Sequence, residues 1–485
     1  MRLKIYQLTL AILLSFTMAE CTIEQEERTQ SIEEPNILVL EDVTVIDGTG
    51  AKPQPHAVIV IEGDRIREIG PKDKIRYSRA AKIIPGKGRY VIPGLFDLHA
   101  HVTFLRDPNR FAGYDRDTTE RILKILLAHG ITTVRNPAAP STEAVVLRDN
   151  VRGGKTTGPR IFTAGEPINW GVEKSAEDVR AEVRRQAKIG VDYIKVYARM
   201  PPELIRAAIE EAHKHGLKVV GHLDATTATE AVRVGIDAVT HGATWSTELL
   251  PPARREAYLK RRQEVGPMLA RLDWLEWADL GGPEIKEMIS TVAQARVPLD
   301  PTLIAYVTKF RGRDPRYRNS PGLMYAPRPV LETWEGALKD WREEDFQRGA
   351  RLWPKILQLI KAYYDNGVLL TAGSDFPNPW VIPGFSLHDE FELLAEAGIP
   401  PLEIIKIATS NSAEGLGILN DVGTLEVRKR ADLVILSADP VADIRNIRKV
   451  EQVILGGKIL DVSFLLKSAN IPEAVIERKV KSALR

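Results

Sequence analysis

The chain has 485 residues, a formal net charge of +2 and a single cysteine. This length exceeds that of one small domain and suits a large catalytic domain with an accessory one. The near-balanced charge argues against a nucleic-acid partner, and one cysteine excludes an internal disulfide and a metal site built from cysteines. The apolar share of 44% predicts an ordinary soluble globular body.

The first residues have a pattern of their own. Residues 1–21 start with a short basic stretch, followed by an apolar run at 5–19 that is too short to cross a bilayer comfortably. This pattern predicts a secretory signal segment, and the acidic, polar residues 22–35 predict a flexible tether. We therefore expect export to the periplasm or the extracellular space. Lipid attachment at Cys21 is an alternative to simple cleavage, although Glu20 fits a lipidation site poorly.

A competing interpretation makes the same residues a frayed helix on a cytoplasmic protein. The rest of the chain has no second apolar run long enough to span a bilayer, so we expect no membrane span in the mature protein.

Strand patterns occupy both ends of the remaining chain. Residues 36–90 contain short β-branched, apolar runs that are separated by turn residues, and the same pattern returns at 421–465. We expect these two segments to build one small β-sandwich domain together. Residues 466–485 have the pattern of a C-terminal helical tail.

Short apolar strands alternate with helical patterns over residues 91–420. The eight candidate strands are 92–101, 132–136, 160–165, 193–198, 218–223, 238–243, 297–302 and 368–375. Repeated alternation implies parallel strands with helical crossovers, and eight such units over roughly 250 residues or more indicate a closed (β/α)8 TIM barrel in an α/β fold. A doubly wound open sheet is the structural alternative.

Two long helical segments, 244–290 and 305–353, follow the sixth and seventh candidate strands. Loops after barrel strands form the active-site face, so these segments are expected to cap the pocket and set substrate preference. The alternative is that their tryptophans merely pack the helices. The arginine cluster at 311–318 could meet a substrate carboxylate, but a solvated surface is the simpler interpretation.

Two histidines end the first candidate barrel strand. His99 and His101 are two residues apart, and on a β-strand such residues point to the same face. Imidazole is a good ligand for zinc and similar ions. The pair is therefore a candidate metal site, although two histidines on a solvated strand face would have the same spacing.

Other strands end in side chains of matching chemistry. They are Lys195 in the fourth, His222 in the fifth, His241 in the sixth and Asp375 in the eighth candidate strand. A barrel gathers its strand ends around one axis, so these residues can meet although they are far apart in the sequence. Each one alone has a structural explanation, but six at matching strand ends indicate one site.

Together these motifs resemble the metal-dependent amidohydrolase superfamily. The markers are Pro93-Gly-Leu-Phe-Asp-Leu-His-Ala-His, Gly130-Ile-Thr-Thr-Val-Arg, Gly221-His, Thr240-His-Gly and Gly373-Ser-Asp. The resemblance covers roughly residues 36–465, including the β domain built from both ends. Within the superfamily the chain is most similar to the imidazolonepropionase-like branch, which includes metal-dependent Xaa-Pro dipeptidases.

The resemblance implies a binuclear metal site. The two histidines of the first strand and Asp375 would hold one divalent cation, and His222 and His241 would hold the second. Lys195 would be carboxylated on its ε-amine and bridge both, because a carbamate supplies anionic oxygen where an ammonium would repel the cations. Zinc is the expected metal. An unmodified Lys195 beside a single metal is the alternative.

The resemblance also implies a mechanism. A hydroxide bridging the two cations would attack a polarised carbonyl, with Asp375 as general base and then general acid. Tyr197, two residues after Lys195, faces the same interior side and could donate a hydrogen bond to the developing oxyanion, or it could be a packed core tyrosine. The expected substrate is an amide: a dipeptide, an Xaa-Pro-like compound or an N-acyl amino acid.

Two other functions stay open at this point. The same site could hydrolyse cyclic amides, lactones or esters, or the chain could be a metal-containing binding protein without catalysis. We expect a small-molecule or dipeptide partner, and a homo-oligomer is allowed but not required. Asp97 is expected to orient groups lower in the barrel, and His388 is weighed as a substrate contact but expected to be structural.

Overall fold

The computed structural model describes residues 37–108, 112–168, 175–242, 245–334, 336–473, 477 and 479. The predicted signal segment, the tether and Cys21 lie outside the described residues, as do most residues of the predicted tail beyond 473. None of the described helices combines the length and the apolar character that a membrane crossing requires. Residues 36–485 form one compact unit, and the domain boundaries predicted within it stay predictions.

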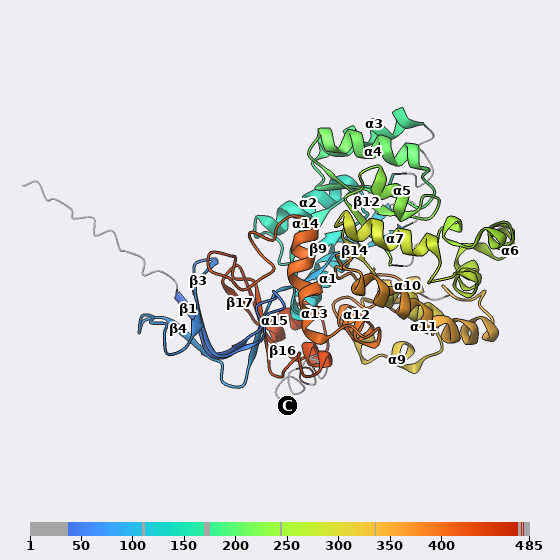
Figure 1. The fold of residues 1–485 in the computed structure, drawn as a ribbon. Coiled ribbons are helices and arrows are strands. Elements are labelled where there is room, and N and C mark those ends of the chain that lie inside the picture. The colour runs from blue at the N-terminus through green and yellow to red at the C-terminus, as the bar shows by residue number, and fades with distance from the viewer. Residues whose placement is uncertain are drawn as a thin grey trace, which may run out of the picture. The chain divides into compact units, whose positions relative to one another are not determined.

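Strands from both ends of the chain share one sheet, as expected (Figure 1). The N-terminal strands are β1 (Ile37–Val45), β2 (Gln54–Glu62), β3 (Arg65–Pro71), β4 (Lys82–Pro85) and β5 (Tyr90–Pro93). The C-terminal strands are β15 (Leu433–Leu436), β16 (Val450–Leu455) and β17 (Lys458–Leu460). Their order is β17-β16-β15-β5-β1-β2-β3, with β4 beside β1. The antiparallel pairing of β15 with β5, in which Val434 lies opposite Ile92, joins the two ends.

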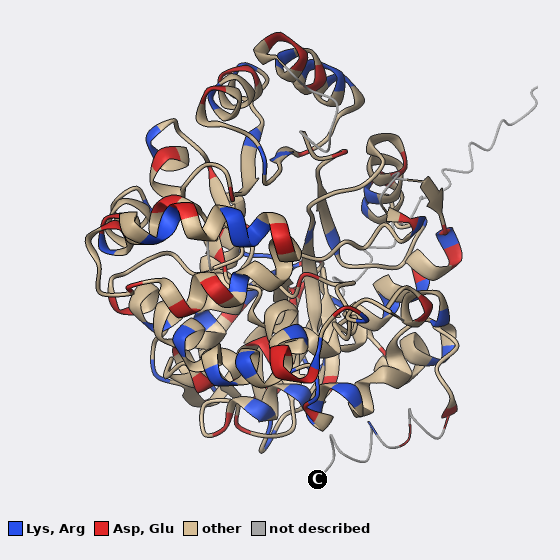
Figure 2. Cartoon of the chain, turned by 90° about the vertical axis from the view of Figure 1, so that its right-hand side faces the viewer, with Lys and Arg blue, Asp and Glu red and all other residues tan. Residues whose placement is uncertain are grey.

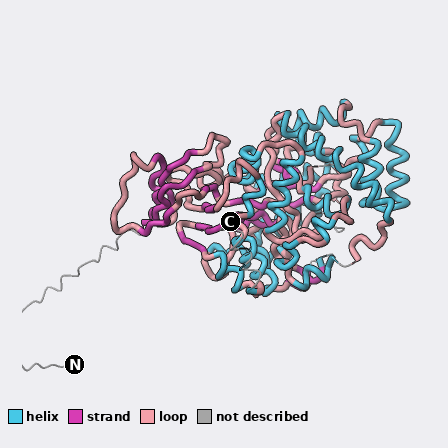
Figure 3. The backbone as a smooth tube through the Cα atoms, turned by 90° about the horizontal axis from the view of Figure 1, so that it is seen from below, coloured by secondary structure: helices cyan, strands magenta, loops and turns pink. Residues whose placement is uncertain are grey.

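Apolar side chains cover both faces of this sheet. Along β2, Ile59 and Ile61 pack into a cluster that also contains Leu433 from the C-terminal strands. Val58 and Val60 alternate with them and pack into a second cluster on the opposite face. The run Val58–Ile61 is therefore continuously apolar because β2 is buried on both sides. Figure 3 shows these strands in magenta, grouped apart from the helix-rich part of the same unit.

The barrel strands are parallel and follow chain order. They are β6 (Leu95–Asp97), β9 (Ile131–Asn136), β10 (Arg160–Thr163), β11 (Tyr193–Val196), β12 (Lys218–His222), β13 (Ala238–Thr240) and β14 (Leu299–Asp300). Parallel pairing runs β6-β9-β10 and β11-β12-β13-β14. Between β6 and β9, the strands β7 (Leu105–Asp107) and β8 (Ala112–Tyr114) form a small antiparallel pair that the sequence patterns did not predict.

Single bridges close these two sheets into a ring. Ile168 forms a parallel bridge to β11, and Leu370 forms one to β14. The backbone N–H of Leu98 donates to the carbonyl of Ala372 at 2.7 Å, which connects the eighth position to the first. Residues 368–376 thus occupy the eighth position without forming a regular strand, where a strand over 368–375 was expected. The closed (β/α)8 barrel is confirmed.

The first predicted strand, 92–101, is divided into β5 and β6. Gly94 lies between them and packs against Thr132, whose Oγ1 would be only 2.1 Å from a Cβ at this position. Glycine is therefore required where the chain passes from the β sheet into the barrel. The apolar pattern continues through this break because both strands are buried.

Helices follow most barrel strands. They are α1 (Arg116–Ala128), α2 (Ser141–Arg152), α3 (Ala176–Ile189), α4 (Pro202–Lys214), α5 (Ala228–Arg233), α7 (Pro283–Gln294), α11 (Glu343–Asp365), α12 (Phe385–Glu396), α13 (Pro401–Lys406), α14 (Ser412–Leu416) and α15 (Val462–Ser468). Helix α3 begins after Ser175, which caps its N-terminus in a capping box, and ends at Gly190, which has the left-handed conformation.

The two long insertions are helical. The first contains α6 (Pro252–Trp277), which breaks at Gly266, where φ is 79° and Pro267 starts the second half. The second contains α8 (Leu303–Phe310), α9 (Pro315–Arg318) and α10 (Arg328–Trp334). Trp274 is fully buried and donates its ring N–H to the carbonyl of Ser246 at 2.8 Å, so it packs the insertion.

Charges of both signs are mixed over the helices. Figure 2 shows Lys and Arg interspersed with Asp and Glu along the helices of that side. Many of them pair across neighbouring helices, such as Arg184 with Glu211 and Arg348 with Asp273. This distribution agrees with the small net charge.

Candidate active site

One cavity of about 450 Å³ lies at the carboxyl ends of the barrel strands. Its lining includes every side chain that the sequence singled out for catalysis or metal binding: His99, His101, Lys195, Tyr197, His222, His241 and Asp375. The structure therefore brings all seven together, although they span nearly three hundred positions. Their chemical roles stay predictions.

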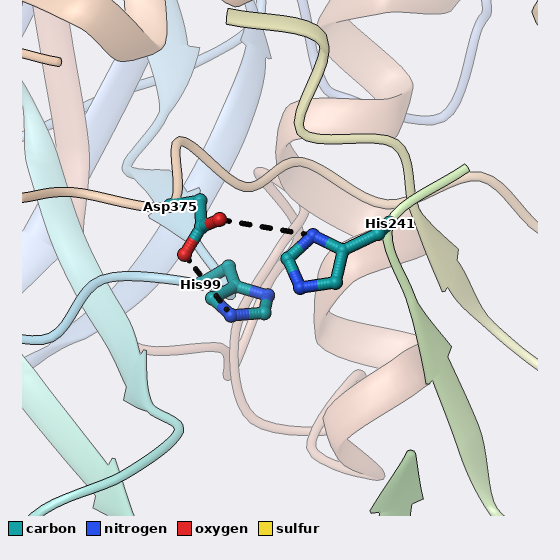
Figure 4. Close-up of side chains that lie close together, drawn as sticks. All are labelled: His99, His241 and Asp375. Atoms are coloured by element: carbon teal, nitrogen blue, oxygen red, sulfur yellow. Dashed lines mark ion pairs between the residues drawn. The ribbon is translucent and has the colours of Figure 1, made fainter. Parts of the chain in front are cut away.

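The Asp375 carboxylate lies among three of the histidines. Its Oδ1 is 3.4 Å from Nε2 of His99 and 3.5 Å from Nε2 of His101. Its Oδ2 is 3.7 Å from Nδ1 of His241 (Figure 4). Single ligand atoms of His99, His241 and Asp375 lie within 4.8 Å of one another, which is a spacing that one metal ion can serve.

Tight backbone turns place these side chains. Asp375 and His241 both have positive φ, 60° and 66°, so each leaves its strand position in the left-handed region. Gly373 lets the eighth position approach the first, because a Cβ there would be 2.9 Å from the Cβ of His99. The backbone N–H of Asp375 then donates to the carbonyl of His99 at 2.6 Å. Such conformations are uncommon for side chains other than glycine and often mark functional sites.

His222 is a direct neighbour of His241. The centroids of the two imidazole rings are 4.3 Å apart, and the ring of Tyr197 is 4.8 Å from that of His222. His222 is the last residue of β12, and Tyr197 directly follows β11. The two histidines expected to share a second cation are thus neighbours.

Burial sets the protonation of three imidazole rings of the cavity. It holds the pKa of His99, His222 and His241 well below the ordinary histidine value, and the positive charge of Lys195 adds to the effect. Burial alone would raise the pKa of Asp375, but the neighbouring His99 and His101 outweigh it and leave that pKa lowered. Neutral imidazoles and an ionised carboxylate are the donor forms that divalent metals require.

Lys195 is 2% exposed and points into the same cavity. Its Nζ donates to Oγ1 of Thr240 at 3.1 Å, and this hydroxyl donates to the carbonyl of Gly221. Burial lowers the pKa of Lys195 to about 7. A substantial fraction of neutral amine is therefore present near neutral pH, and the neutral amine is the form that can react with carbon dioxide.

A buried ion pair behind His99 was missed in the sequence. Nδ1 of His99 donates to Oδ2 of Asp300 at 2.7 Å, and Nη2 of Arg135 donates to the other carboxylate oxygen at 2.6 Å. Nε of Arg135 also donates to the carbonyl of Leu98. This arrangement assigns the proton of His99 to Nδ1 and directs the Nε2 lone pair toward Asp375, as carboxylate partners of metal-binding histidines do.

Both missed residues carried a signal. Asp300 lies within the seventh candidate strand, 297–302, and is the last residue of the observed strand β14, close to the strand ends that carry the other site residues. Arg135 ends the Gly130–Arg135 marker, which served only to support the family resemblance. His241 also has a hydrogen-bond partner for one ring nitrogen, since its Nδ1 lies 2.9 Å from Oγ1 of Thr302.

Asp97 has the supporting position expected of it. Its carboxylate accepts hydrogen bonds from the backbone N–H of Ser374 at 2.9 Å and from the Ser374 hydroxyl at 2.6 Å. It also accepts from the backbone N–H of His99. Burial raises the pKa of Asp97 to about 7. The residue therefore ties the first barrel strand to the eighth position below the cavity.

The remaining candidates lie elsewhere. His388 donates from Nε2 to the carbonyl of His129 at 3.0 Å and is absent from the cavity lining, so its structural interpretation agrees with the fold. In the arginine cluster, Arg313 and Arg318 border a separate hollow beside Trp380. The cavity instead contains two cations that the sequence patterns did not indicate, Arg271 and Lys309.

Comparison with known proteins agrees with this geometry. A model described as "Amidohydrolase family" matches residues 90–460. An imidazolonepropionase from Symbiobacterium thermophilum is 25% identical over 396 residues, which cover 79% of this chain and 84% of that protein. An enamidase from Eubacterium barkeri is 25% identical over 221 residues, or 41% of this chain and 54% of that protein.

Solved structures share the fold. A Xaa-Pro dipeptidase with bound methionine in its active site has a TM-score of 0.65 and 23% identity, over 88% of this chain and 100% of that one. A bottromycin amidohydrolase has a TM-score of 0.67 and 21% identity, over 93% of this chain and 91% of that one. The chain belongs to the amidohydrolase family and is a hydrolase that acts on carbon–nitrogen bonds.

Proposed function

We propose that the chain is a binuclear metallohydrolase that cleaves the amide bond of a dipeptide, an Xaa-Pro-like compound or an N-acyl amino acid. The observation that carries this proposal is the position of the Asp375 carboxylate, which lies within 3.4 to 3.7 Å of ring nitrogens of His99, His101 and His241. His222 adjoins His241 in the same cavity. Four imidazoles and one carboxylate that line one cavity are a donor set for divalent cations.

Each ligand fits this role by its chemistry. His99, His101 and Asp375 would hold one cation, and His222 and His241 the other, with Lys195 as a carbamate between them. The lowered pKa of Lys195, about 7, supports carboxylation because it keeps the amine available in its neutral form. Zinc suits histidine and carboxylate ligands. The cations would supply Lewis-acid polarisation of the substrate carbonyl and a lowered pKa for a bound water.

Asp375 is the proposed proton carrier. Its carboxylate is ionised in the folded protein, since His99 and His101 lower its pKa. It lines the cavity from the eighth strand position, so it can accept a proton from the attacking water and return it to the leaving nitrogen. Three ring nitrogens lie 3.4 to 3.7 Å from its two oxygens and fix the directions in which they face.

Tyr197 is the proposed donor to the developing oxyanion. Its ring adjoins His222 at the cavity wall. Burial raises the pKa of its hydroxyl, so the proton stays on the oxygen at neutral pH and can be donated in a hydrogen bond.

Export is a separate proposal. It is supported by the basic start and the apolar run of residues 1–21, with Cys21 as the site of an alternative lipid anchor. Fractionation of expressing cells tests it. Protein found outside the cytoplasm, and shifted to the membrane only when Cys21 is present, would support the anchor; full retention in the cytoplasm would contradict export.

The hydrolytic proposal is tested by metal analysis and a substrate panel. Purified protein, made replete with zinc, is expected to hold two metal ions per chain and to hydrolyse at least one dipeptide or N-acyl amino acid. Two bound metals without hydrolysis of any amide or ester would favour a binding protein. Activity with one metal per chain would contradict the binuclear site.

A further inference from the structure

Two cations in the active-site cavity form no direct ion pair with a carboxylate of the described residues, although the charge of Asp375 acts on Lys309 from a longer distance. Arg271 lies in the second half of α6, after the break at Gly266, and Lys309 lies in α8. Both therefore come from the insertions after the sixth and seventh strands. Uncompensated charge in a partly buried site is costly unless a ligand neutralises it.

Aromatic rings hold the Arg271 guanidinium in place. Its Cζ lies 5.2 Å from the ring centroid of Trp245 and 5.5 Å from that of Tyr306. The Tyr306 ring is in turn 6.2 Å from the ring of His241. One aromatic ring thus separates Arg271 from the catalytic histidines. Contacts with ring faces orient a guanidinium without removing its charge, so its N–H groups stay suited to an anion.

Lys309 is anchored beside Asp375. It is only 8% exposed, and its Nζ donates to Oδ1 of Asn378 at 2.7 Å. The side-chain amide of Asn378 donates to the carbonyl of Asp375 at 2.9 Å. The partner of Lys309 is thus a neutral amide, and an ammonium group has further N–H donors for a ligand.

The charges of the cavity lining favour an anionic substrate. Lys195 is the proposed carbamate, so Arg271 and Lys309 are the basic residues of the described lining, and Asp375 is its one acidic residue. The Asp375 oxygens already face histidine nitrogens. A carboxylate suits a guanidinium because both are planar and can form paired hydrogen bonds.

We propose that Arg271 and Lys309 form the subsite for a free carboxylate of the substrate, so that the enzyme acts on acyl amino acids or dipeptides with an unblocked C-terminus. This inference rests on the proposed amide hydrolysis and assigns residues that select its substrate. A cavity of about 450 Å³ has room for a molecule of that size.

The test compares free acids with their primary amides. Zinc-replete protein receives a panel of N-acetyl amino acids with different side chains, each paired with its C-terminal amide. The variants are R271Q and K309M. The control variants are R254Q, on the same helix but outside the cavity lining, and K286M, at an exposed lysine of α7.

We expect kcat/KM for the best acid to exceed that of its amide about 100-fold. R271Q should lower kcat/KM for the acid by about 10- to 100-fold and change the amide by less than about threefold, as loss of a charged hydrogen bond predicts. K309M should lower the acid-to-amide ratio of kcat/KM by about 10- to 100-fold, whatever its effect on both substrates through Asn378 and Asp375. R254Q and K286M should keep the wild-type preference. A defect in folding would lower both substrates together and leave the ratio unchanged.

Calorimetric titration of the same pairs separates this inference from the proposed function. If no compound is hydrolysed, the proposed hydrolysis fails for this class of substrates. The carboxylate subsite is still supported if acids bind more tightly than amides and if R271Q and K309M lose this difference. Equal affinity for acid and amide, no binding of any acid, or an acid preference that both variants retain would each overturn it.

Discussion

The strand ends of the barrel and the two helical insertions meet at one cavity, but they are built by different rules. The strand ends supply the histidines, Lys195 and Asp375, whose positions follow from the parallel closed topology. The insertions supply Arg271 and Lys309, whose positions depend on a helix break at Gly266 and on the packing of α8. The comparison teaches that barrel geometry sets the positions of the candidate catalytic side chains, whereas the tertiary packing of added helices sets the positions of the proposed carboxylate subsite.

Replacing Asp375 should cause the largest effect and tests the strand-end side of this comparison. We expect D375N to lower kcat by about 10²- to 10⁴-fold with a much smaller change in KM, because an amide cannot take the water's proton. Steady-state kinetics measures both constants. The control D365N changes an exposed aspartate of α11 and should behave as wild type. A kcat for D375N within about threefold of wild type would contradict the assigned role.

Replacing Lys195 tests the bridge between the two metal positions. K195A removes the side chain that would carry the carbamate, so bound metal and activity should fall together, with activity lower by at least about 100-fold. Metal analysis of the purified protein and hydrolysis of the best substrate check this. K188A, at an exposed lysine of α3, is the matched control. Two metals per chain and near-normal rates in K195A would rule out the bridge.

Replacing Asp300 sharpens the comparison, because Asp300 orients the proposed metal ligand His99 but would not bind the metal itself. D300N removes the carboxylate that orients His99 and leaves the guanidinium of Arg135 without its ion pair. We expect about 10- to 100-fold weaker metal binding and a free energy of unfolding lower by about 3–5 kcal/mol. Competition with a chelator and urea unfolding measure the two effects. D73N, at an exposed turn of the β domain, should change neither.

Unchanged metal affinity in D300N, together with the stability loss, would show that the ion pair serves the fold alone. In that outcome the orientation of His99 would have to come from its other contacts, such as the Asp375 carboxylate.

The smallest expected effect is the pH dependence of the folding stability. It comes from His129 and His388, which lie outside the cavity lining. Burial lowers the pKa of His129 and His388 well below the ordinary histidine value, so both stay neutral in the folded protein. The unfolded chain takes up protons near pH 6.5, so this contribution to stability is complete above that pH and is lost as the pH falls below it. Each histidine can contribute up to about 1.4 kcal/mol per pH unit.

Urea unfolding of wild type and H388Q at pH 7.5 and 5.5 checks this expectation. The variant should lose about 1 kcal/mol less stability over this interval than wild type, because one of the two histidines no longer titrates. Equal losses in the two proteins would contradict a neutral, buried His388.

Much of the fold could be predicted because its strands alternate with amphipathic helices at regular spacing. The matching strand patterns at both ends indicated a shared sheet. The eighth position was expected as a regular strand, but Asp375 turns into the left-handed conformation there and its pairing consists of isolated contacts. The split at Gly94 was missed because apolar residues continue on both sides.

The site residues likewise divide into those that the sequence predicted and those that it did not. Residues such as His222 could be predicted because strand ends converge in any barrel. Asp300 was missed although it lies within a predicted strand, 297–302, since one aspartate among many carries no distinctive spacing. Arg271 could not be found from the pattern, because its place in the cavity depends on the backbone angle of Gly266 and on the rings of Trp245 and Tyr306.

The most direct test of the whole account is anomalous X-ray diffraction from crystals of the zinc-loaded protein. The account predicts two zinc peaks in the cavity, one bound by His99, His101 and Asp375 and the other by His222 and His241, with carbamate density on Lys195 between them. Full zinc loading without a peak at these side chains, or a peak that none of the four histidines touches, would contradict it.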